Sequence, residues 1–415
     1  MSRSCAWRVF VCFFSLCLSS ASPSSNFLSS VLVSGYDEPP PCSLNGYMAA
    51  NGTCICDKPW TGSNCETLQV LPVSFPQGFG MAPKKTVWGS DILFRDGLYH
   101  LFASSMSNGT SLRHWATHSQ IEHAVSKNIT GPFVFQDVAV PRFSHNPKVI
   151  ELQDGKLALI HIGMGEPRLI DNDDSKDGMS VFDSGNEKRK LRSPSQGSTI
   201  HTSDSPYGPW IPLQNNTLGN CNNPAPFVVF ASCEKSHVIY IVCSHAGNGV
   251  LKRAERIEGP WETVSVVTPG NMSHHERHKN DNEVHYEDPS LYIDRRGFHI
   301  IYHAYIRNEH PPHGSNCTRA TVSKYLFSQD GLNWHIAPGH PFGTQFEVEG
   351  KGFITAATRE RPSLFFEPDS SGQHRMTHLV TSVCGVPNCP RGPAAGCVNC
   401  KYDNWDYTLV QPLVT

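Results

Sequence analysis

Short apolar runs alternate with turn-forming residues from about residue 70 to the end of the chain. The runs are rich in Val, Ile, Phe and Tyr, and Gly, Asn, Asp and Pro separate them. This alternation is typical of β-strands joined by tight turns. Nowhere in this region does the apolar spacing indicate an amphipathic helix of ten residues or more. The pattern therefore predicts an all-β domain.

Five segments of this region share one order of positions, in which a polar start leads into an apolar strand, a turn and a second apolar strand. The polar starts are Trp88-Gly89-Ser90-Asp91, His145-Asn146-Pro147, Asn222-Asn223-Pro224, Glu287-Asp288-Pro289 and Glu360-Arg361-Pro362. A single four-stranded unit cannot bury both of its faces, whereas units packed around an axis bury them and leave few exposed edges. We expect a five-bladed β-propeller over residues 72–415, with the polar starts at the axis. A β-sandwich with chance repetition is the alternative.

A second repeated signal follows most of these units. Gly-Pro-aromatic triplets occur at Gly131-Pro132-Phe133, Gly208-Pro209-Trp210 and Gly259-Pro260-Trp261, and Gly331-Leu332-Asn333-Trp334 takes their place in the fourth unit. We expect each to be the turn between the third and fourth strands of a blade. The apolar run over 405–412 predicts a last strand that closes the ring, either alone or jointly with residues near 70–80.

The beginning of the chain resembles an export signal. Arg3 and Arg8 precede a short apolar stretch over 9–18, and small residues follow at Ser19-Ser20-Ala21, which predicts a signal peptide over 1–21. The apolar stretch is too short to span a bilayer, and no later stretch is longer. We expect a secreted, extracellular protein without a transmembrane segment, followed by a Ser/Pro-rich linker over 22–41. An uncleaved amino-terminal anchor is the alternative.

Cysteines and glycosylation motifs agree with export. Of the 15 cysteines, Cys5, Cys12 and Cys17 leave with the signal, and the even number that remains fits disulfide pairing. Asn-x-Ser/Thr motifs, which predict a surface glycoprotein, occur at Asn51, Asn108, Asn128, Asn215, Asn271 and Asn316. We expect two bridges, rather than a zinc site, among Cys384, Cys389, Cys397 and Cys400. The order of pairing stays open among Cys221, Cys233, Cys243 and Cys317.

The spacing of Cys42, Cys54, Cys56 and Cys65 resembles the carboxyl half of an epidermal-growth-factor-like module, over residues 42–66. A full module has six cysteines, so this one is partial. The resemblance implies the bridges Cys42–Cys54 and Cys56–Cys65. So small a segment has almost no core, and the bridges must hold it together. It is either a structural spacer or a binding site for an extracellular protein partner.

Charge and histidine content exclude two classes of partner. The 34 basic and 37 acidic residues nearly cancel, and no basic stripe indicates nucleic acid. The histidines at 274, 275, 278 and 285 lie in a highly polar run that we interpret as a solvated loop rather than a metal site. No metal or cofactor is expected.

The polar starts, the Asp-Gly turns and the Gly-Pro-Trp triplets over residues 75–415 resemble the five-bladed propellers of family 43 and family 32 glycoside hydrolases. That resemblance implies a glycan in the central funnel and axial carboxylates that act as base, pKa-tuning group and acid. Asp91 matches the base, whereas Asn146 and Asn223 stand where the tuning Asp and the acid Glu belong. An amide can neither donate a proton as an acid nor carry a negative charge.

The remaining axial residues leave both catalysis and binding open. Glu287 and Asp288 are candidates to supply a carboxyl group across the funnel, beside the base candidate Asp91, although Asp288 could instead cap backbone amides. The candidate substrate-binding residues are Trp88, His145, Asn146, Asn223, Arg359 and Arg361. The arginines suit an acidic sugar, or they pair with Glu287 or Asp288.

Trp88 suits stacking on a sugar ring, or it packs inside a blade. The sequence thus predicts a secreted carbohydrate-active protein, a glycoside-hydrolase-like propeller that acts on or binds a glycan. Whether it is an enzyme is left open. A non-catalytic extracellular propeller that binds glycans or proteins is the alternative function.

Overall fold

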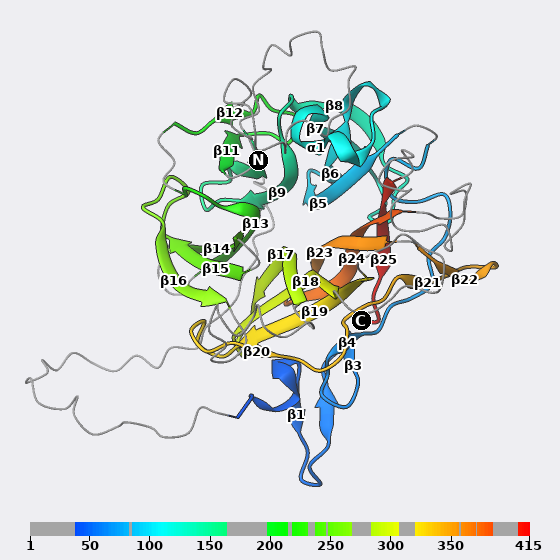
Figure 1. The fold of residues 1–415 in the computed structure, drawn as a ribbon, viewed down its shortest axis with the longest axis vertical. Helices are drawn as coiled ribbons and strands as arrows, with labels where there is room; N and C mark the ends of the chain where they lie inside the picture. Colours follow the sequence, from blue (N-terminus) through cyan, green and yellow to red (C-terminus); the bar gives the residue numbers. More distant parts are fainter. Residues whose placement is uncertain are drawn as a thin grey trace, which may run out of the picture.

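The computed structural model describes residues 38–82, 85–163, 197–214, 218–230, 237–245, 248–267, 284–306, 320–356, 358–370, 372–384 and 406–415. These residues form five antiparallel sheets arranged around a common centre (Figure 1). In each sheet the strands follow one another in chain order from the innermost strand outwards. The predicted five-bladed β-propeller is therefore confirmed.

Each blade is one antiparallel sheet made of strands that are consecutive in the chain. Blade one consists of β5 (Val87–Arg95), β6 (Leu98–Met106), β7 (Ser119–Ser126) and β8 (Val134–Val140). Blade two consists of β9 (His145–Glu151), β10 (Leu157–Ile162), β11 (Ser198–Ser203) and β12 (Ile211–Pro212). Blade three consists of β13 (Asn222–Phe230), β14 (His237–His245), β15 (Asn248–Ala254) and β16 (Glu262–Val267). Blade four consists of β17 (Val284–Ile293), β18 (Phe298–Ile306), β19 (Ala320–Ser328) and β20 (His335–Ile336). Blade five consists of β23 (Thr358–Pro368), β24 (His374–Cys384) and β25 (Asp406–Pro412).

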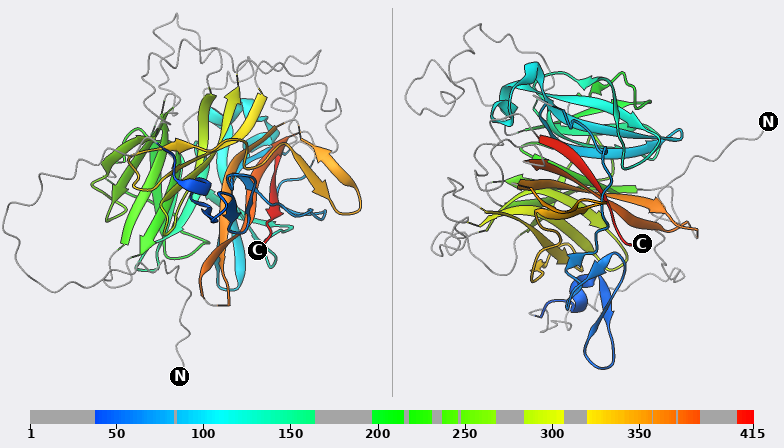
Figure 2. Two further views of the ribbon diagram at one scale, coloured as in Figure 1. Left: turned by 90° about the horizontal axis from the view of Figure 1, so that it is seen from below. Right: turned by 90° about the vertical axis from the view of Figure 1, so that its right-hand side faces the viewer.

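The ring closes between blades five and one. The innermost strands β5, β9, β13, β17 and β23 contact one another in that order, and β23 contacts β5. Strand β25, from the end of the chain, pairs with β24, while Val70 bridges to Leu413 and Phe79 to Thr408. In Figure 2 the blue segment that follows the small hairpins lies beside the red strand β25. Both ends of the propeller region therefore join in blade five, as expected.

Packing between blades explains why strand β10 of blade two is buried on both faces. All six residues of β10 are buried. Leu101 and Ala124 of blade one share a buried cluster with Val380 and Val410 of blade five. Because each blade lies between two neighbours, both of its faces leave water.

The repeated glycines form equivalent turns. Gly131, Gly208 and Gly259 have φ values of 85°, 82° and 101°, which glycine adopts without a steric penalty. Each lies between the third and fourth strands of its blade. Gly331 holds the same place in blade four, between β19 and β20, with a φ of 74°. The turns predicted from the Gly-Pro triplets are confirmed.

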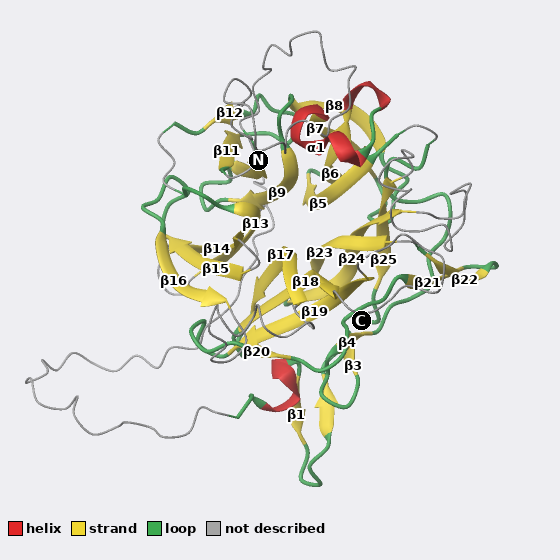
Figure 3. Ribbon diagram, in the orientation of Figure 1, coloured by secondary structure: helices red, strands yellow, loops and turns green. Residues whose placement is uncertain are grey.

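The remaining elements are short (Figure 3). The helices are η1 (Pro41–Leu44), η2 (Ser107–Gly109), η3 (Leu112–His114) and α1 (Trp115–His118), and the small hairpins are β1 (Gly46–Met48) with β2 (Cys54–Cys56), β3 (Trp60–Thr61) with β4 (Thr67–Leu68), and β21 (Gln345–Val348) with β22 (Gly352–Thr355). Within the described ranges, no helix is both long and apolar enough to cross a membrane.

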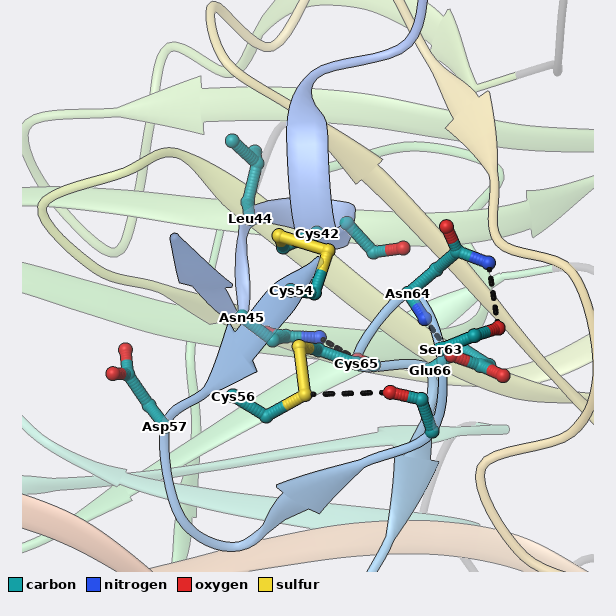
Figure 4. The surroundings of a disulfide bond; sticks show 12 residues. Cys42, Leu44, Asn45, Cys54, Cys56, Asp57, Ser63, Asn64, Cys65 and Glu66 are labelled. Atoms are coloured by element: carbon teal, nitrogen blue, oxygen red, sulfur yellow. Dashed lines mark hydrogen bonds between the residues drawn. A yellow bond between two sulfur atoms is a disulfide. The ribbon is translucent and has the colours of Figure 1, made fainter. Parts of the chain in front are cut away.

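Two disulfides staple residues 42–69, which we call the cystine module. The bridges are Cys42–Cys54 and Cys56–Cys65, so the predicted pairing is confirmed (Figure 4). Inside the module, the side-chain amide of Asn45 donates a hydrogen bond of 3.0 Å to the carbonyl of Cys65.

The cystine module packs against blade four. The rings of Trp60 and Tyr325 have centroids 4.9 Å apart, and the Tyr325 hydroxyl donates a hydrogen bond of 2.8 Å to the carbonyl of Ser43. Beneath them, Tyr292 stacks on His299 with a centroid distance of 4.3 Å. The module and blade four share one buried apolar cluster. A structural role, one of the two alternatives for this segment, is therefore built into the fold.

One further disulfide, Cys221–Cys243, lies in blade three and resolves part of the open pairing. Cys384 is buried and forms no bridge with another cysteine of the described ranges. Outside those ranges lie the predicted signal peptide, most of the predicted linker, Cys233, Cys317, Cys389, Cys397, Cys400, His274, His275, His278 and the side chain of His285.

Candidate functional site

Each innermost strand carries one extra residue near its start. In blade four, for example, Glu287 pairs with His303, but Ser290 pairs with Ile301, so β17 advances three residues while β18 advances two. The same shift occurs in the other four blades. The positive-φ residues at these β-bulges are Gly89, Asn146, Asn223, Asp288 and Arg361, with φ between 48° and 63°. Such bulges redirect a side chain, and φ values in this range favour Gly, Asn and Asp.

These five residues, which we call the bulge ring, meet across the axis. The side-chain amide of Asn146 donates a hydrogen bond of 2.7 Å to Oδ1 of Asn223. The guanidinium of Arg361 donates one of 2.9 Å to the same oxygen and forms an ion pair with Asp288. The space left at the ring is only about 20 Å³, which holds about one water molecule. The ring therefore divides the axis into an amino-terminal end, where the innermost strands begin, and a carboxyl-terminal end.

Gly89, rather than Asp91, is the first-blade equivalent of Asn146. The sequence alignment of Asp91 with Asn146 and Asn223 is therefore wrong by two residues. The misalignment arose because the other four ring residues precede a proline, whereas Gly89 precedes Ser90. A Cβ atom at Gly89 would lie 2.6 Å from Oδ1 of Asn146, so the first-blade position has no room for a side chain.

Asp91 lies on the carboxyl-terminal side of the bulge ring. Its carboxylate accepts a hydrogen bond of 2.6 Å from the Ser363 hydroxyl and one of 2.9 Å from the backbone amide of Val149. Asp91 thus connects the innermost strands of blades one, two and five. The other two candidates for catalysis, Glu287 and Asp288, instead contact His303.

Four ionisable side chains meet at the amino-terminal end, and we call them the carboxylate cluster: Glu287, Asp288, His303 and Glu360. Nδ1 of His303 lies 2.7 Å from a carboxylate oxygen of Asp288. Its Nε2 lies 3.5 Å from an oxygen of Glu287 and 3.9 Å from one of Glu360. The Glu287 side chain is 41% exposed and that of Glu360 only 3%, so two carboxyl groups with different access to water face one imidazole.

The carboxylate cluster determines the charge of His303. Burial alone would lower the pKa of this histidine, but the carboxylates of Asp288 and Glu360 raise it to about 10. His303 is therefore an imidazolium at neutral pH. With Arg361 it supplies the positive charge that three acidic side chains need in a confined space.

Three members of the carboxylate cluster, Glu287, Asp288 and His303, are spaced as metal ligands could be. One donor atom of each lies within 4.8 Å of the others. A protonated imidazole is a poor ligand, because ligation needs its free electron pair. The arrangement is accounted for by ion pairing.

Trp88 and His145 lie beside the bulge ring but pack into the protein. Trp88 is 2% exposed and packs with Met106 and Leu112, so blade packing describes it rather than stacking on a sugar. His145 is buried and shares a hydrogen bond of 2.7 Å with the Ser119 hydroxyl. Burial, reinforced by the nearby charge of Arg361, holds the pKa of His145 well below its usual range.

Of the two arginines considered for the axis, Arg361 reaches it and Arg359 does not. The Arg359 guanidinium donates hydrogen bonds to the side chains of Gln411, at 2.7 Å, and Thr381, at 3.1 Å. It also lies over the Phe342 ring, and burial lowers its pKa to about 9. Since neighbouring residues of a strand point to opposite faces, Arg359 enters the blade while Glu360 joins the carboxylate cluster. For Arg361 the predicted ion pair with Asp288 is confirmed.

The sequence analysis missed two members of the carboxylate cluster, His303 and Glu360. A signal for each was present. Glu287 and Glu360 both stand two residues before the proline of their repeat, so the repeat itself aligns them. Counting across the blade-four hairpin places His303 opposite Glu287.

No model of a known protein family and no curated protein sequence matches the chain. Solved structures resemble it at 13% sequence identity. The catalytic domain of a family 62 α-L-arabinofuranosidase from Coprinopsis cinerea matches 83% of this chain and 97% of its own, with a TM-score of 0.48. Zg3597, a family 117 glycoside hydrolase produced by the marine bacterium Zobellia galactanivorans, matches 84% of this chain and 89% of its own, with a TM-score of 0.45.

A third structure, a thermostable family-43 glycoside hydrolase, matches 84% of this chain and 93% of its own at 13% identity, with a TM-score of 0.46. Family 43 is one of the two families that the repeat pattern resembles.

Proposed function

We propose that this protein is a carbohydrate-active propeller that hydrolyses glycosidic bonds at the amino-terminal end of its axis. The observation that carries the proposal is the pair Glu287 and Glu360. One oxygen of each lies within 4 Å of the same nitrogen of His303, so these oxygens are at most about 7.4 Å apart, the sum of 3.5 and 3.9 Å. Glycoside hydrolysis needs two carboxyl groups on either side of the bond, about 5–9.5 Å apart.

The two carboxyl groups would divide the work. One donates a proton to the leaving oxygen, and the other attacks the sugar or activates a water molecule. Such a division needs two carboxyl groups in different environments, and the unequal exposure of Glu287 and Glu360 supplies this difference. The imidazolium of His303, which faces both carboxyl groups, would limit their mutual repulsion and hold both in place.

Glycan binding without cleavage is the second candidate function. Gly89, Asn146 and Asn223 place no ionisable group at three of the five bulge positions, and the carboxylate of Asp288 is already paired with Arg361 and His303. A propeller of this kind would recognise sugar hydroxyls through amides and charged pairs without turning over its ligand.

The test incubates the purified full-length protein with a panel of neutral and acidic polysaccharides and measures both bound and released sugar. We expect Glu287→Gln and Glu360→Gln each to reduce release by at least about a hundredfold, with Glu347→Gln, on an exposed residue of β21, as the matched control. Release that survives both substitutions would contradict the assignment. Binding without release by the unsubstituted protein would select the second candidate function.

We also propose that the protein is exported. Three disulfides, Cys42–Cys54, Cys56–Cys65 and Cys221–Cys243, support an oxidising compartment. The acceptor asparagines Asn51, Asn108 and Asn128 are exposed, as glycosylation requires. Expression in a secreting eukaryotic cell should yield protein in the medium whose mobility in a denaturing gel increases after enzymatic removal of N-glycans. Retention inside the cell without a mobility change would count against this proposal.

A further inference from the structure

A concave site lies at the carboxyl-terminal end of the axis, on the other side of the bulge ring from the carboxylate cluster. It is a cavity of about 630 Å³, within the range of about 300–1,000 Å³ that holds small-molecule ligands. Its floor is formed by the residues two positions after each bulge: Asp91, Lys148, Ala225, Ser290 and Ser363. The narrow space at the ring keeps this cavity separate from the proposed hydrolytic end.

The floor is polar and carries both signs of charge. The carboxylate of Asp91 accepts hydrogen bonds from Ser363 and from the backbone of Val149, which fix its orientation. Lys148, half-buried, reaches to within 3.4 Å of the carbonyl of Pro362. Burial lowers the pKa of Lys148, although the Asp91 carboxylate acts against this. A ligand that enters the cavity therefore meets an oriented acceptor beside a donor.

The walls above this floor are aromatic and aliphatic. Phe227 and Phe366 approach edge to face, with ring centroids 6.5 Å apart, and both line the cavity. On the blade-one side, Phe94 and Tyr99 have ring centroids 4.7 Å apart. Polar side chains return at the rim, which includes Glu151, Gln153 and Glu367.

This order of polar floor, aromatic walls and polar rim fits a neutral sugar. A pyranose ring has apolar faces that pack on aromatic rings, and its hydroxyls both donate and accept hydrogen bonds. Three acidic side chains, Asp91, Glu151 and Glu367, outnumber the single lysine, so an acidic sugar is disfavoured. A purely apolar ligand would displace water from the charged groups of Asp91 and Lys148 without offering either of them a hydrogen bond.

We propose that this cavity binds a short neutral oligosaccharide, with Asp91 and Lys148 holding its hydroxyls and Phe227 and Phe366 packing against its rings. The site is distinct from the carboxylate cluster and does not depend on hydrolysis there. It gives Asp91 a role in ligand binding at the opposite end of the axis from Glu287 and Glu360.

The test titrates the full-length protein calorimetrically with xylotriose, cellotriose and maltotriose. We expect at least one trisaccharide to bind, and Lys148→Met and Phe366→Ala each to weaken that binding by at least about tenfold, because each removes a hydrogen-bond donor or a packing surface. Glu360→Gln, at the other end of the axis, should change the dissociation constant by less than twofold. Circular dichroism and denaturation midpoints show that each variant is folded, and two unlike substitutions keep the test valid if one of them unfolds the protein.

Two outcomes would overturn this inference. One is the absence of binding by all three trisaccharides at millimolar concentration while the apolar dye anilinonaphthalene sulfonate binds and is lost in Phe366→Ala. The other is binding that is weakened by Glu360→Gln but not by Lys148→Met, which would place the sugar at the carboxylate cluster. The hydrolysis test depends on Glu287 and Glu360 alone, so the two proposals can fail separately.

Discussion

The two ends of the propeller axis are built from the same five strands but differ in chemistry. At the amino-terminal end, the residues just before the bulges of blades four and five, Glu287 and Glu360, meet His303 in a confined cluster of charges. At the carboxyl-terminal end, the residues two positions after the bulges form the floor of a cavity about 630 Å³ in size. One bulge per strand separates a compact charged site from an open, partly aromatic one.

The difference between the ends follows from how each bulge residue is satisfied. Asn146, Asn223, Asp288 and Arg361 bind one another across the axis, so none of them points freely into either end. The innermost strands thus form three successive layers: charged side chains before the bulges of blades four and five, paired side chains at the bulges, and the floor of the cavity after them. The following predictions test whether these layers are separate.

The largest effect is expected from opening the middle layer with Asp288→Asn. The substitution removes the carboxylate that faces both Arg361 and His303, and its side chain is only 2% exposed. Breaking a buried pair in this way costs about 3–5 kcal/mol of unfolding free energy, measurable by urea denaturation at neutral pH. Asp96→Asn, on a side chain that is 86% exposed, is the control and should cost less than about 0.5 kcal/mol. Equal losses in the two variants would show that the ring is not a stabilising layer.

A pH titration should distinguish the charged end from the neutral histidines in the blades. The pKa of His303 is raised to about 10 from an ordinary 6.5, so its contribution to stability is complete below pH 6.5 and is lost as the pH rises through 10. Burial lowers the pKa values of His161 and His201 to about 3 and 4. Their contribution is therefore lost as the pH falls from 6.5 towards 4. Each proton contributes a slope of at most about 1.4 kcal/mol per pH unit.

The measurement for this prediction is the urea midpoint from pH 4 to pH 10. His303→Gln should reduce the fall of the urea midpoint at alkaline pH. It should leave the fall of the midpoint at acid pH unchanged, because His161 and His201 lie in blade two. An alkaline fall that persists in His303→Gln would mean that the carboxylate cluster does not hold a proton there.

The smallest effect is expected at the first-blade position of the ring. In Gly89→Ala the new Cβ would lie 2.6 Å from Oδ1 of Asn146, at a φ of 63°. The strain and the displaced amide should cost about 1–3 kcal/mol. Gly97→Ala is the matched control in the same blade, with a positive φ of 79° and nothing within 4 Å of the added carbon, and should cost about 1 kcal/mol. Combining Gly89→Ala with Asn146→Ala should recover the stability that Gly89→Ala loses beyond the loss in Gly97→Ala. No recovery would place the strain in the backbone alone.

Much of the fold was predictable because its signals are local and repeated. Pro147, Pro224, Pro289 and Pro362 mark the same bulge in four blades, and the Gly-Pro turns mark the way to the outer strand. The error at Asp91 arose in the one blade without that proline. There the bulge residue is identifiable only from its positive φ and its contact with Asn146.

The candidate site was less predictable, because its residues are brought together by packing between blades. The strand start of blade five left open which of Arg359 and Arg361 reaches the axis. Alternation within β23 buries Arg359 in the blade and turns Glu360 to the cluster. The pairing of Cys221 with Cys243 was equally beyond the sequence, since four cysteines allow three connectivities.

The aromatic stack that joins the cystine module to blade four has a mechanical consequence. The Trp60 ring packs on the Tyr325 ring, and the Tyr325 hydroxyl donates a hydrogen bond to Ser43, so two separate contacts fasten the module to blade four. Its outer hairpin, where Tyr47 and Ile55 are exposed, is therefore held in one position relative to the propeller. Anything attached there would keep a constant distance from the axis and turn in solution together with the whole molecule.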